Sequence, residues 1–161
     1  MNLNPDFGQL IDENKGTIQK VCRVYTDSRE DFLDVYQEVC LQLWKSHESF
    51  RGDSSLSTWI YRVAINTCIG QLRKRKKEPN HHSLQPHHDI RQEDDNERRE
   101  KLDQLYGAIR SLKETDRALI LLYLEDKSYK EITEILGMTM SNVGVRINRI
   151  KGQLKEMING K

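Results

Sequence analysis

The stretch Phe50–Lys77, FRGDSSLSTWIYRVAINTCIGQLRKRKK, contains a turn, a helical pattern and a basic run in that order. Gly52, Asp53 and their neighbouring serines are typical of a loop, and Ser55 or Ser57 can cap a helix over Leu56–Lys74. Aromatic residues beside fixed positive charge suit unstacked nucleic acid, because aromatic faces accept bases while Lys and Arg contact phosphates. This stretch therefore predicts a helix that binds unstacked nucleic acid.

The aromatic and basic residues of this stretch each allow a second interpretation. Trp59 and Tyr61 flank the apolar side of the predicted helix, so each ring can face nucleic acid or form the edge of the core with its polar tip outward. The run Arg73–Lys77 can be a solvated helix end favoured by the helix dipole. Five consecutive basic residues exceed what a helix end requires, which favours phosphate contacts.

Length and composition indicate an all-α chain. The 161 residues suffice for one ordinary domain or two small ones. Only three prolines and nine glycines accompany many good helix formers. The formal net charge is +1, but basic residues gather at Arg73–Lys77 and Arg146–Lys155 and acidic ones at Glu93–Glu100. Two basic patches on either side of an acidic segment favour an anionic partner.

The N-terminus and the cysteines indicate a cytoplasmic protein. Met1–Phe7 has neither the basic start nor the apolar run of a signal peptide, and no apolar stretch is long enough to insert into a membrane. Cys22, Cys40 and Cys68 are odd in number and lie on or beside apolar helical stripes. Reduced core thiols are therefore favoured over a disulfide or metal framework.

Two helices are predicted before the opening stretch. Apolar residues from Phe7 to Tyr25 follow helical spacing and predict one continuous helix. Ser28 can cap the next helix, and Asp31, three residues further on, can complete a capping-box-like arrangement. One face of that helix is apolar, and its opposite face carries Asp34, Gln37, Glu38, Leu41 and Lys45. A leucine within an acidic and polar face indicates either a docking surface or a solvated face with one stray apolar residue.

The segment Glu78–Asn96 lacks apolar periodicity and is predicted to be a mobile linker. Its pairs His81-His82 and His87-His88 have no ordered scaffold that could fix a coordination geometry. No metal or cofactor is therefore predicted. Beyond it an apolar stripe predicts a helix up to Leu112, and Thr115-Asp116 can cap a further helix over Arg117–Glu125.

The C-terminal part carries a helix-turn-helix pattern. Tyr129–Leu136 forms a short helix that ends at Gly137, and Thr139 can cap a long helix from Met140. Gly144 inside this helix costs about 1 kcal/mol relative to alanine and indicates close approach to DNA or to the preceding helix. The outward residues suit a major groove. They are Ser141, Asn142, Val145, Asn148 and Arg149, with Arg146 and Lys151 at the borders. An ordinary helical hairpin with a basic surface is the alternative.

Three segments resemble the extracytoplasmic-function sigma factors, the dissociable subunits of bacterial RNA polymerase. DVYQEVCLQLW (Asp34–Trp44) resembles the family's D-x-x-Q-E-V-F-L-x-x-W and departs from it at Cys40. FRGDSSLSTWIYRVAIN (Phe50–Asn66) is similar to F-R-G-x-x-x-x-x-T-W-L-Y-R-I-A-x-N. SYKEITEILGMTMSNVGVRINRIK (Ser128–Lys151) resembles the C-terminal helix-turn-helix. The resemblance covers nearly the whole chain.

The resemblance implies two small helical domains, residues 1–77 and 101–161, joined by a flexible linker at 78–100. The residues implied to dock on the clamp helices of core RNA polymerase are Asp34, Gln37, Glu38 and Leu41. Those implied to engage the melted −10 element are Phe50, Arg51, Trp59, Tyr61, Arg62 and Asn66, with Arg73, Lys74 and Arg75 on phosphates. Those implied at the −35 duplex are Ser141, Asn142, Gly144, Val145, Arg146, Asn148, Arg149 and Lys151, among which Gly144 and Val145 depart from the family pattern.

The implied partners are core RNA polymerase, promoter DNA as duplex and melted strand, and an anti-sigma factor. The implied function is promoter recognition, −10 melting and initiation, without enzymatic activity and without a cofactor. The main alternative is a stand-alone helix-turn-helix regulator, which would leave Phe50–Lys77 and the Asp34–Leu41 face unused. An enzyme using the histidines and Asp94-Asp95, or a helical adaptor that does not bind DNA, would be weaker alternatives.

Overall fold

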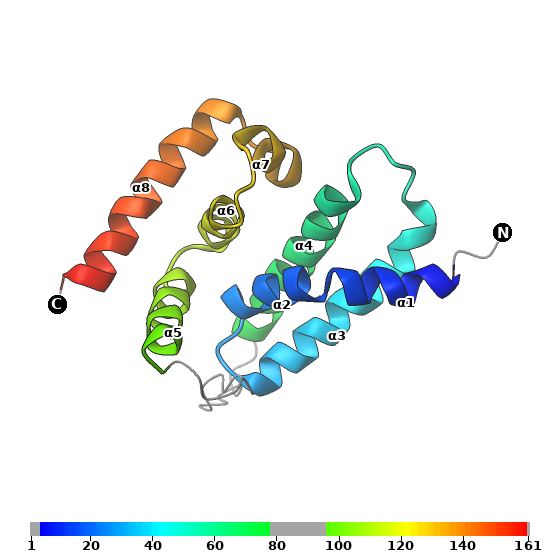
Figure 1. The fold of residues 1–161 in the computed structure, drawn as a ribbon, viewed down its shortest axis with the longest axis horizontal. Coiled ribbons are helices and arrows are strands. Elements are labelled where there is room, and N and C mark those ends of the chain that lie inside the picture. Colours follow the sequence, from blue (N-terminus) through cyan, green and yellow to red (C-terminus); the bar gives the residue numbers. More distant parts are fainter. Residues whose placement is uncertain (1–3, 78–95, 161) are drawn as a thin grey trace. The chain divides into compact units, whose positions relative to one another are not determined.

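A computed structural model describes residues 4–77 and 96–160, and these residues form helices joined by turns and loops, without strands (Figure 1). The predicted all-α class is confirmed. The chain divides into two units, Met1–Leu84 and Gln85–Lys161, each with its own core. The predicted linker residues 78–95 and their histidines lie outside the described residues.

The first unit is built on three mutually packed helices. They are α2 (Lys15–Val24), α3 (Arg29–Ser46) and α4 (Leu56–Lys76), accompanied by α1 (Asn4–Glu13) and the short 3₁₀ helix η1 (His47–Ser49). Both long helices begin as predicted at serine caps, because Ser28 Oγ accepts from Asp31 N at 3.1 Å and Ser55 Oγ accepts from Thr58 N at 3.1 Å. The buried core includes Ile18, Val21, Val35, Val39, Leu43, Ile60, Ala64 and Ile65.

The N-terminal stripe forms two helices, so the prediction of one continuous helix is wrong. Asn14 separates α1 from α2 with φ −113° and ψ 13°. Its side-chain amide donates to Leu10 O at 2.9 Å, a carbonyl to which its backbone N–H also donates at 3.2 Å. Asparagine favours such local bonds, which explains the break at a position that apolar spacing does not mark.

The three thiols are free, in agreement with the prediction of reduced cysteines. Cys22 on α2 and Cys68 on α4 are fully buried with their sulfurs 4.0 Å apart, and Cys40 on α3 is half-buried. The hydrogen bond with Cys22, together with burial, raises the pKa of the Cys68 thiol well above its usual value. Burial and the neighbouring Cys40 raise the pKa of Tyr36 to about 12. The Cys68 thiol and the Tyr36 hydroxyl therefore stay neutral at physiological pH.

The second unit contains α5 (Asn96–Arg110), α6 (Glu114–Leu124), α7 (Tyr129–Leu136) and α8 (Met140–Asn159), and α8 packs on all three others. Its core includes Ile109, Leu119, Leu122, Ile132, Val143, Ile147 and Ile150. Gly137 takes the left-handed conformation at φ 68°, and Thr139 Oγ1 accepts from Asn142 N at 3.2 Å. The predicted helix-turn-helix over α7 and α8 is present.

Helix α5 begins at Asn96, where the aperiodic segment was predicted to end, so residues Asn96–Glu100, which the resemblance assigned to the linker, are helical. The start of the next helix differs from the prediction. Helix α6 begins at Glu114, with Lys113 as its N-cap residue, so Asp116 does not cap it. Asp116 lies instead in the first turn and is buried. The sequence pattern favoured a cap because an aspartate before an apolar run usually serves as one.

Candidate nucleic-acid and protein interfaces

The outward face of α3 is more apolar than the sequence suggested. Asp34 and Gln37 are exposed, and Leu41 is 43% exposed. Glu38 is half-buried and accepts from Gln42 Nε2 at 3.0 Å. The sequence reasoning did not assign two further exposed side chains, Leu33 (47%) and Trp44 (45%).

Leu33, Gln37, Leu41 and Trp44 recur at intervals of four, four and three residues, which places them on one stripe of α3. Helical spacing counted from Leu41 could have revealed the two additional members. Leu41 is therefore one of several exposed apolar side chains on this stripe, and it is not isolated. Three exposed apolar side chains on one stripe, with Gln37 between them and Asp34 and Glu38 beside them, suit a protein partner.

One end of this stripe is held by an aromatic cluster. The Phe7 ring of α1 meets Trp44 edge-on, with ring centroids 5.1 Å apart and planes at 74°. His47 lies 5.1 Å from Phe7 and 4.9 Å from Trp44, centroid to centroid. These contacts fix the indole of Trp44 while leaving almost half of it exposed.

The loop after η1 and the start of α4 bring two aromatic rings together. Phe50 and Trp59 lie with centroids 5.0 Å apart and planes at 34°, and both are half-buried. Tyr61 is only 4% exposed and belongs to the core. The sequence left open which of Trp59 and Tyr61 packs into the core, and the structure shows that Tyr61 does. Stacking of a base on Tyr61 would require the core to open.

The polar part of this surface is unevenly exposed. Arg51, Asn66, Arg73 and Lys74 are exposed, and Arg62 is half-buried. Arg75 Nη2 donates to Tyr25 O at 2.8 Å, which ties the end of α4 to the C-cap of α2. Arg75 thus has a structural contact of its own in addition to its charge.

On α8 the predicted recognition residues form one exposed face. They are Ser141, Asn142, Val145, Asn148 and Arg149, and Val145 is 68% exposed. Lys151 is directed toward α6, with Nζ 3.3 Å from Tyr123 Oη and 5.1 Å from the centroid of that ring.

Gly144 lies against the preceding helix. A Cβ added there would meet Tyr129 Cε2 of α7 at 3.5 Å, an ordinary van der Waals distance. The sequence suggested that Gly144 allows close approach either to DNA or to the preceding helix, and within the protein its neighbour is that preceding helix, α7. The contact is loose enough for alanine.

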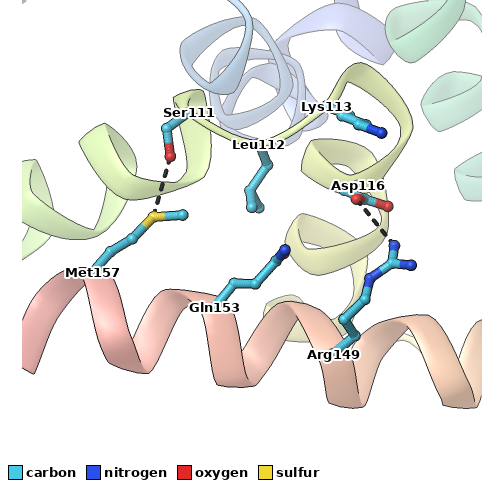
Figure 2. Close-up of a pocket in the computed structure, with 7 residues that line it drawn as sticks. All are labelled: Ser111, Leu112, Lys113, Asp116, Arg149, Gln153 and Met157. Atoms are coloured by element: carbon cyan, nitrogen blue, oxygen red, sulfur yellow. Dashed lines mark hydrogen bonds and ion pairs between the residues drawn. The ribbon is translucent and has the colours of Figure 1, made fainter. Parts of the chain in front are cut away.

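A buried carboxylate holds two arginines of α8. Asp116 of α6 is 4% exposed, with Oδ1 paired to Arg146 Nη2 and Oδ2 3.4 Å from Arg149 Nη2. Figure 2 shows Arg149 directed toward Asp116 across an open groove. The sequence suggested Asp116 only as a helix cap and not as a partner of these arginines, because they lie 30 and 33 residues further along the chain and no local pattern joins them to it.

Residues 4–77 and 96–160 contain no group of three or more His, Cys, Asp or Glu side chains placed to hold a metal ion. No helix in this described part of the chain is long and apolar enough to cross a membrane.

Comparison with known proteins identifies each unit. The family model for Sigma-70 region 2 matches residues 10–78, and the model for Sigma-70 region 4 matches residues 102–154. These matches define the class as a sigma factor of the sigma-70 type. The ECF RNA polymerase sigma-E factor of Haemophilus influenzae is 33% identical over 171 residues, covering 94% of this chain and 87% of that protein. Its Escherichia coli K12 counterpart is 32% identical, covering 75% and 70% respectively.

Within that class, the chain belongs to the extracytoplasmic-function sigma factors of RNA polymerase. Two solved structures share its fold. RpoE of Bartonella quintana, in complex with the anti-sigma factor NepR, gives a TM-score of 0.76 at 19% identity and covers 96% of this chain and 97% of that one. CnrH, in complex with the cytosolic domain of CnrY, gives 0.70 at 20% identity, covering 96% and 88%.

Proposed function

We propose that the two units divide promoter recognition between them. Residues 1–77 hold core RNA polymerase and the opened −10 strand, the second unit from Asn96 onward reads the −35 duplex, and residues 78–95 connect the two. The observation that carries the proposal is the pair of surfaces on the first unit, the α3 stripe and the Phe50–Trp59 pair. A stand-alone helix-turn-helix regulator has no use for either.

The polymerase surface is the outward face of α3. Asp34, Gln37, Glu38 and Leu41 supply its polar and apolar contacts, and Leu33 and Trp44 extend it. Leu41 and Trp44 are fixed on a rigid helix, so little conformational entropy is lost when a partner helix packs on them. This face is the proposed anchor of the complex.

The strand-capturing surface runs from the loop along α4. Phe50 and Trp59 provide aromatic area, Arg51, Arg62 and Asn66 provide polar contacts, and the basic end provides charge for phosphates. Tyr61 is buried in the core of the first unit and is not part of this surface. Arg73 and Lys74 carry the phosphate role, with Arg75 supporting the helix end.

The duplex-reading surface is the exposed face of α8. Asn142 and Asn148 have amides suited to adenine, Arg149 has a guanidinium suited to guanine, and Val145 is apolar. Ser141 and Gly144 permit close approach to the duplex. Arg146 and Lys151 are directed toward α6 and border this face.

The remaining expectations follow from sigma-factor function. We propose that the chain acts in the cytoplasm on core RNA polymerase, that an anti-sigma factor controls it, and that it catalyses no reaction itself. The solved structure of Bartonella quintana RpoE is a complex with the anti-sigma factor NepR, and that of CnrH is a complex with the cytosolic domain of CnrY. An inhibitor that covers the α3 stripe would block polymerase binding.

The test is in vitro transcription with bacterial core RNA polymerase across a genomic promoter library. The full chain should direct initiation at a subset of promoters that share two spaced elements. Leu41→Asp should abolish this activity by placing a charge within the apolar stripe. Tight, sequence-specific binding by the chain alone, with no dependence on core enzyme, would favour the stand-alone regulator instead.

A further inference from the structure

Asp116 is a buried charged residue that the proposed contacts with DNA do not use. It lies in the first turn of α6, where the helix dipole favours a carboxylate. Its side chain is 6% exposed, and a buried carboxylate without partners would be strongly unfavourable. Arg146 and Arg149, one turn apart on α8, supply those partners. The cluster joins α6 to the helix that carries the proposed recognition face.

The two arginines are held to different degrees. Arg146 is 23% exposed, pairs closely with Oδ1, and its other terminal nitrogen lies 4.0 Å from Met138 Sδ. Arg149 is 54% exposed and reaches Oδ2 only at 3.4 Å. A guanidinium has five N–H donors, so a single long contact leaves most of those of Arg149 for another ligand. Arg146 is turned inward, whereas Arg149 is oriented but still accessible.

The groove in Figure 2 shows how Arg149 is aligned. The space of about 330 Å³ lies between α8 and the turn that joins α5 to α6, and it is lined by Lys113, Asp116, Arg149 and Gln153 among others. Arg149 runs along its edge toward the carboxylate. Asp116 therefore restricts the rotamers of Arg149 without covering it.

We propose that Asp116 is a positioning residue that determines the specificity of promoter recognition. It holds Arg149 in the orientation that reads a base edge, and it keeps Arg146 away from DNA phosphates. A restrained arginine loses less freedom when it binds a base. Its carboxylate also repels phosphates, which weakens sequence-independent binding. The inference rests on the proposed reading of duplex DNA by α8.

The experiment uses the full chain assembled with core RNA polymerase. Its probes are one promoter selected from the transcription library and the same promoter with a scrambled −35 element. Asp116→Asn keeps the side-chain shape and removes the charge. The ratio of affinities for the two probes should fall about two- to tenfold. Affinity for the scrambled probe should rise, because the two released arginines reach phosphates. For the same reason, the slope of log affinity against log salt concentration should become more negative by about 1 to 2. Equal weakening on both probes with an unchanged slope would make Asp116 a structural ion pair only and overturn the inference.

A double-mutant comparison distinguishes the positioning role of Asp116 from the proposed reading of a base by Arg149. In an Arg149→Ala background, Asp116→Asn should no longer change the ratio. If Arg149→Ala alone leaves the ratio unchanged, the proposed role of Arg149 is wrong. If Arg149→Ala lowers the ratio but Asp116→Asn does not, only the positioning role is wrong.

If the Asp116→Asn protein does not fold, the salt dependence of DNA binding by an Arg146→Gln protein tests the proposal instead. It leaves the Asp116–Arg149 pair in place and removes the inward arginine. The salt slope should stay unchanged, because Arg146 does not reach phosphate in the proposed arrangement. A slope less negative by about 1 would show a phosphate contact and contradict the proposal.

Discussion

The side chain of Val145 is the most exposed large apolar group on the proposed recognition face of α8. Asn142, Asn148 and Arg149 surround it at helical spacing. An isopropyl group offers no hydrogen bond to a base edge, and the thymine methyl is the one apolar group in the major groove. We therefore expect Val145 to select thymine at the position that it contacts.

Replacing single thymines of the −35 element by deoxyuracil tests this contact, because the exchange removes only the methyl group. At the position facing Val145, affinity should fall about fourfold, the value of one buried methyl group. The Val145→Ala protein should be insensitive to the same exchange. Sensitivity that persists in the variant would assign the methyl contact to another residue.

Gly144 and Gly137 form a matched pair for a stability measurement. Gly144→Ala should stabilise the second unit by about 0.5–1 kcal/mol, because the added Cβ meets Tyr129 at an ordinary 3.5 Å within a regular helix. Gly137→Ala should destabilise it by about 1–2 kcal/mol, because Gly137 has φ 68°. Chemical denaturation measures both. Destabilisation by Gly144→Ala would show that the two helices cannot tolerate the methyl group.

Among the elements, α4 serves both the core and the proposed strand-binding surface. Tyr61, Ile65 and Cys68 follow one another at intervals of four and three residues and are all buried. Residues two apart on a helix point in nearly opposite directions, roughly 200° apart. Trp59 and Tyr61 therefore cannot both face DNA, and the structure places Trp59 beside Phe50.

Substitutions at these two aromatics should have separable effects. Trp59→Ala should impair promoter opening, measured by permanganate reactivity of melted thymines, while core binding persists. Tyr61→Ala should instead unfold the first unit more easily, by about 3–5 kcal/mol, because a large buried ring is lost. Tyr61→Phe is the control that keeps the ring. A Trp59→Ala protein that loses core binding would show that Trp59 stabilises the fold instead.

At the scale of the whole molecule, the two proposed DNA-binding surfaces lie on units with separate cores. Two weak sites on one chain bind tightly only when something fixes their separation. We propose that core RNA polymerase provides that constraint. The affinity of the free chain should then be low and insensitive to the distance between promoter elements.

Changing the promoter spacer by about 5 bp, half a helical turn, tests this dependence. Binding of the complex with core enzyme should fall steeply, since the −35 element rotates to the opposite side of the duplex. Binding of the free chain should change little. Equal tolerance in both states would mean that the polymerase does not hold the two surfaces at a fixed distance.

Local chemistry made much of this protein predictable. Serine and threonine caps at Ser28, Ser55 and Thr139 mark helix starts, and Gly137 marks a turn, because each satisfies backbone groups within a few residues. The alternation of apolar and polar positions likewise places Asp34, Leu41 and Asn142 on exposed faces. The short-range pattern failed at Asn14, where the side-chain amide bonds to the Leu10 carbonyl and the backbone leaves the helical conformation.

The sequence by itself determined the helical class, the helix-turn-helix and the exposed polar faces, since these depend on neighbours within one or two turns. Only the tertiary structure decided that Tyr61 packs inward and that Leu33 and Trp44 extend the Leu41 stripe. Only the tertiary structure revealed the ion pairs of Asp116 with Arg146 and Arg149. The physical reason is distance along the chain: packing brings α6 against α8, and a buried carboxylate must take its counter-charge from whichever helix lies there.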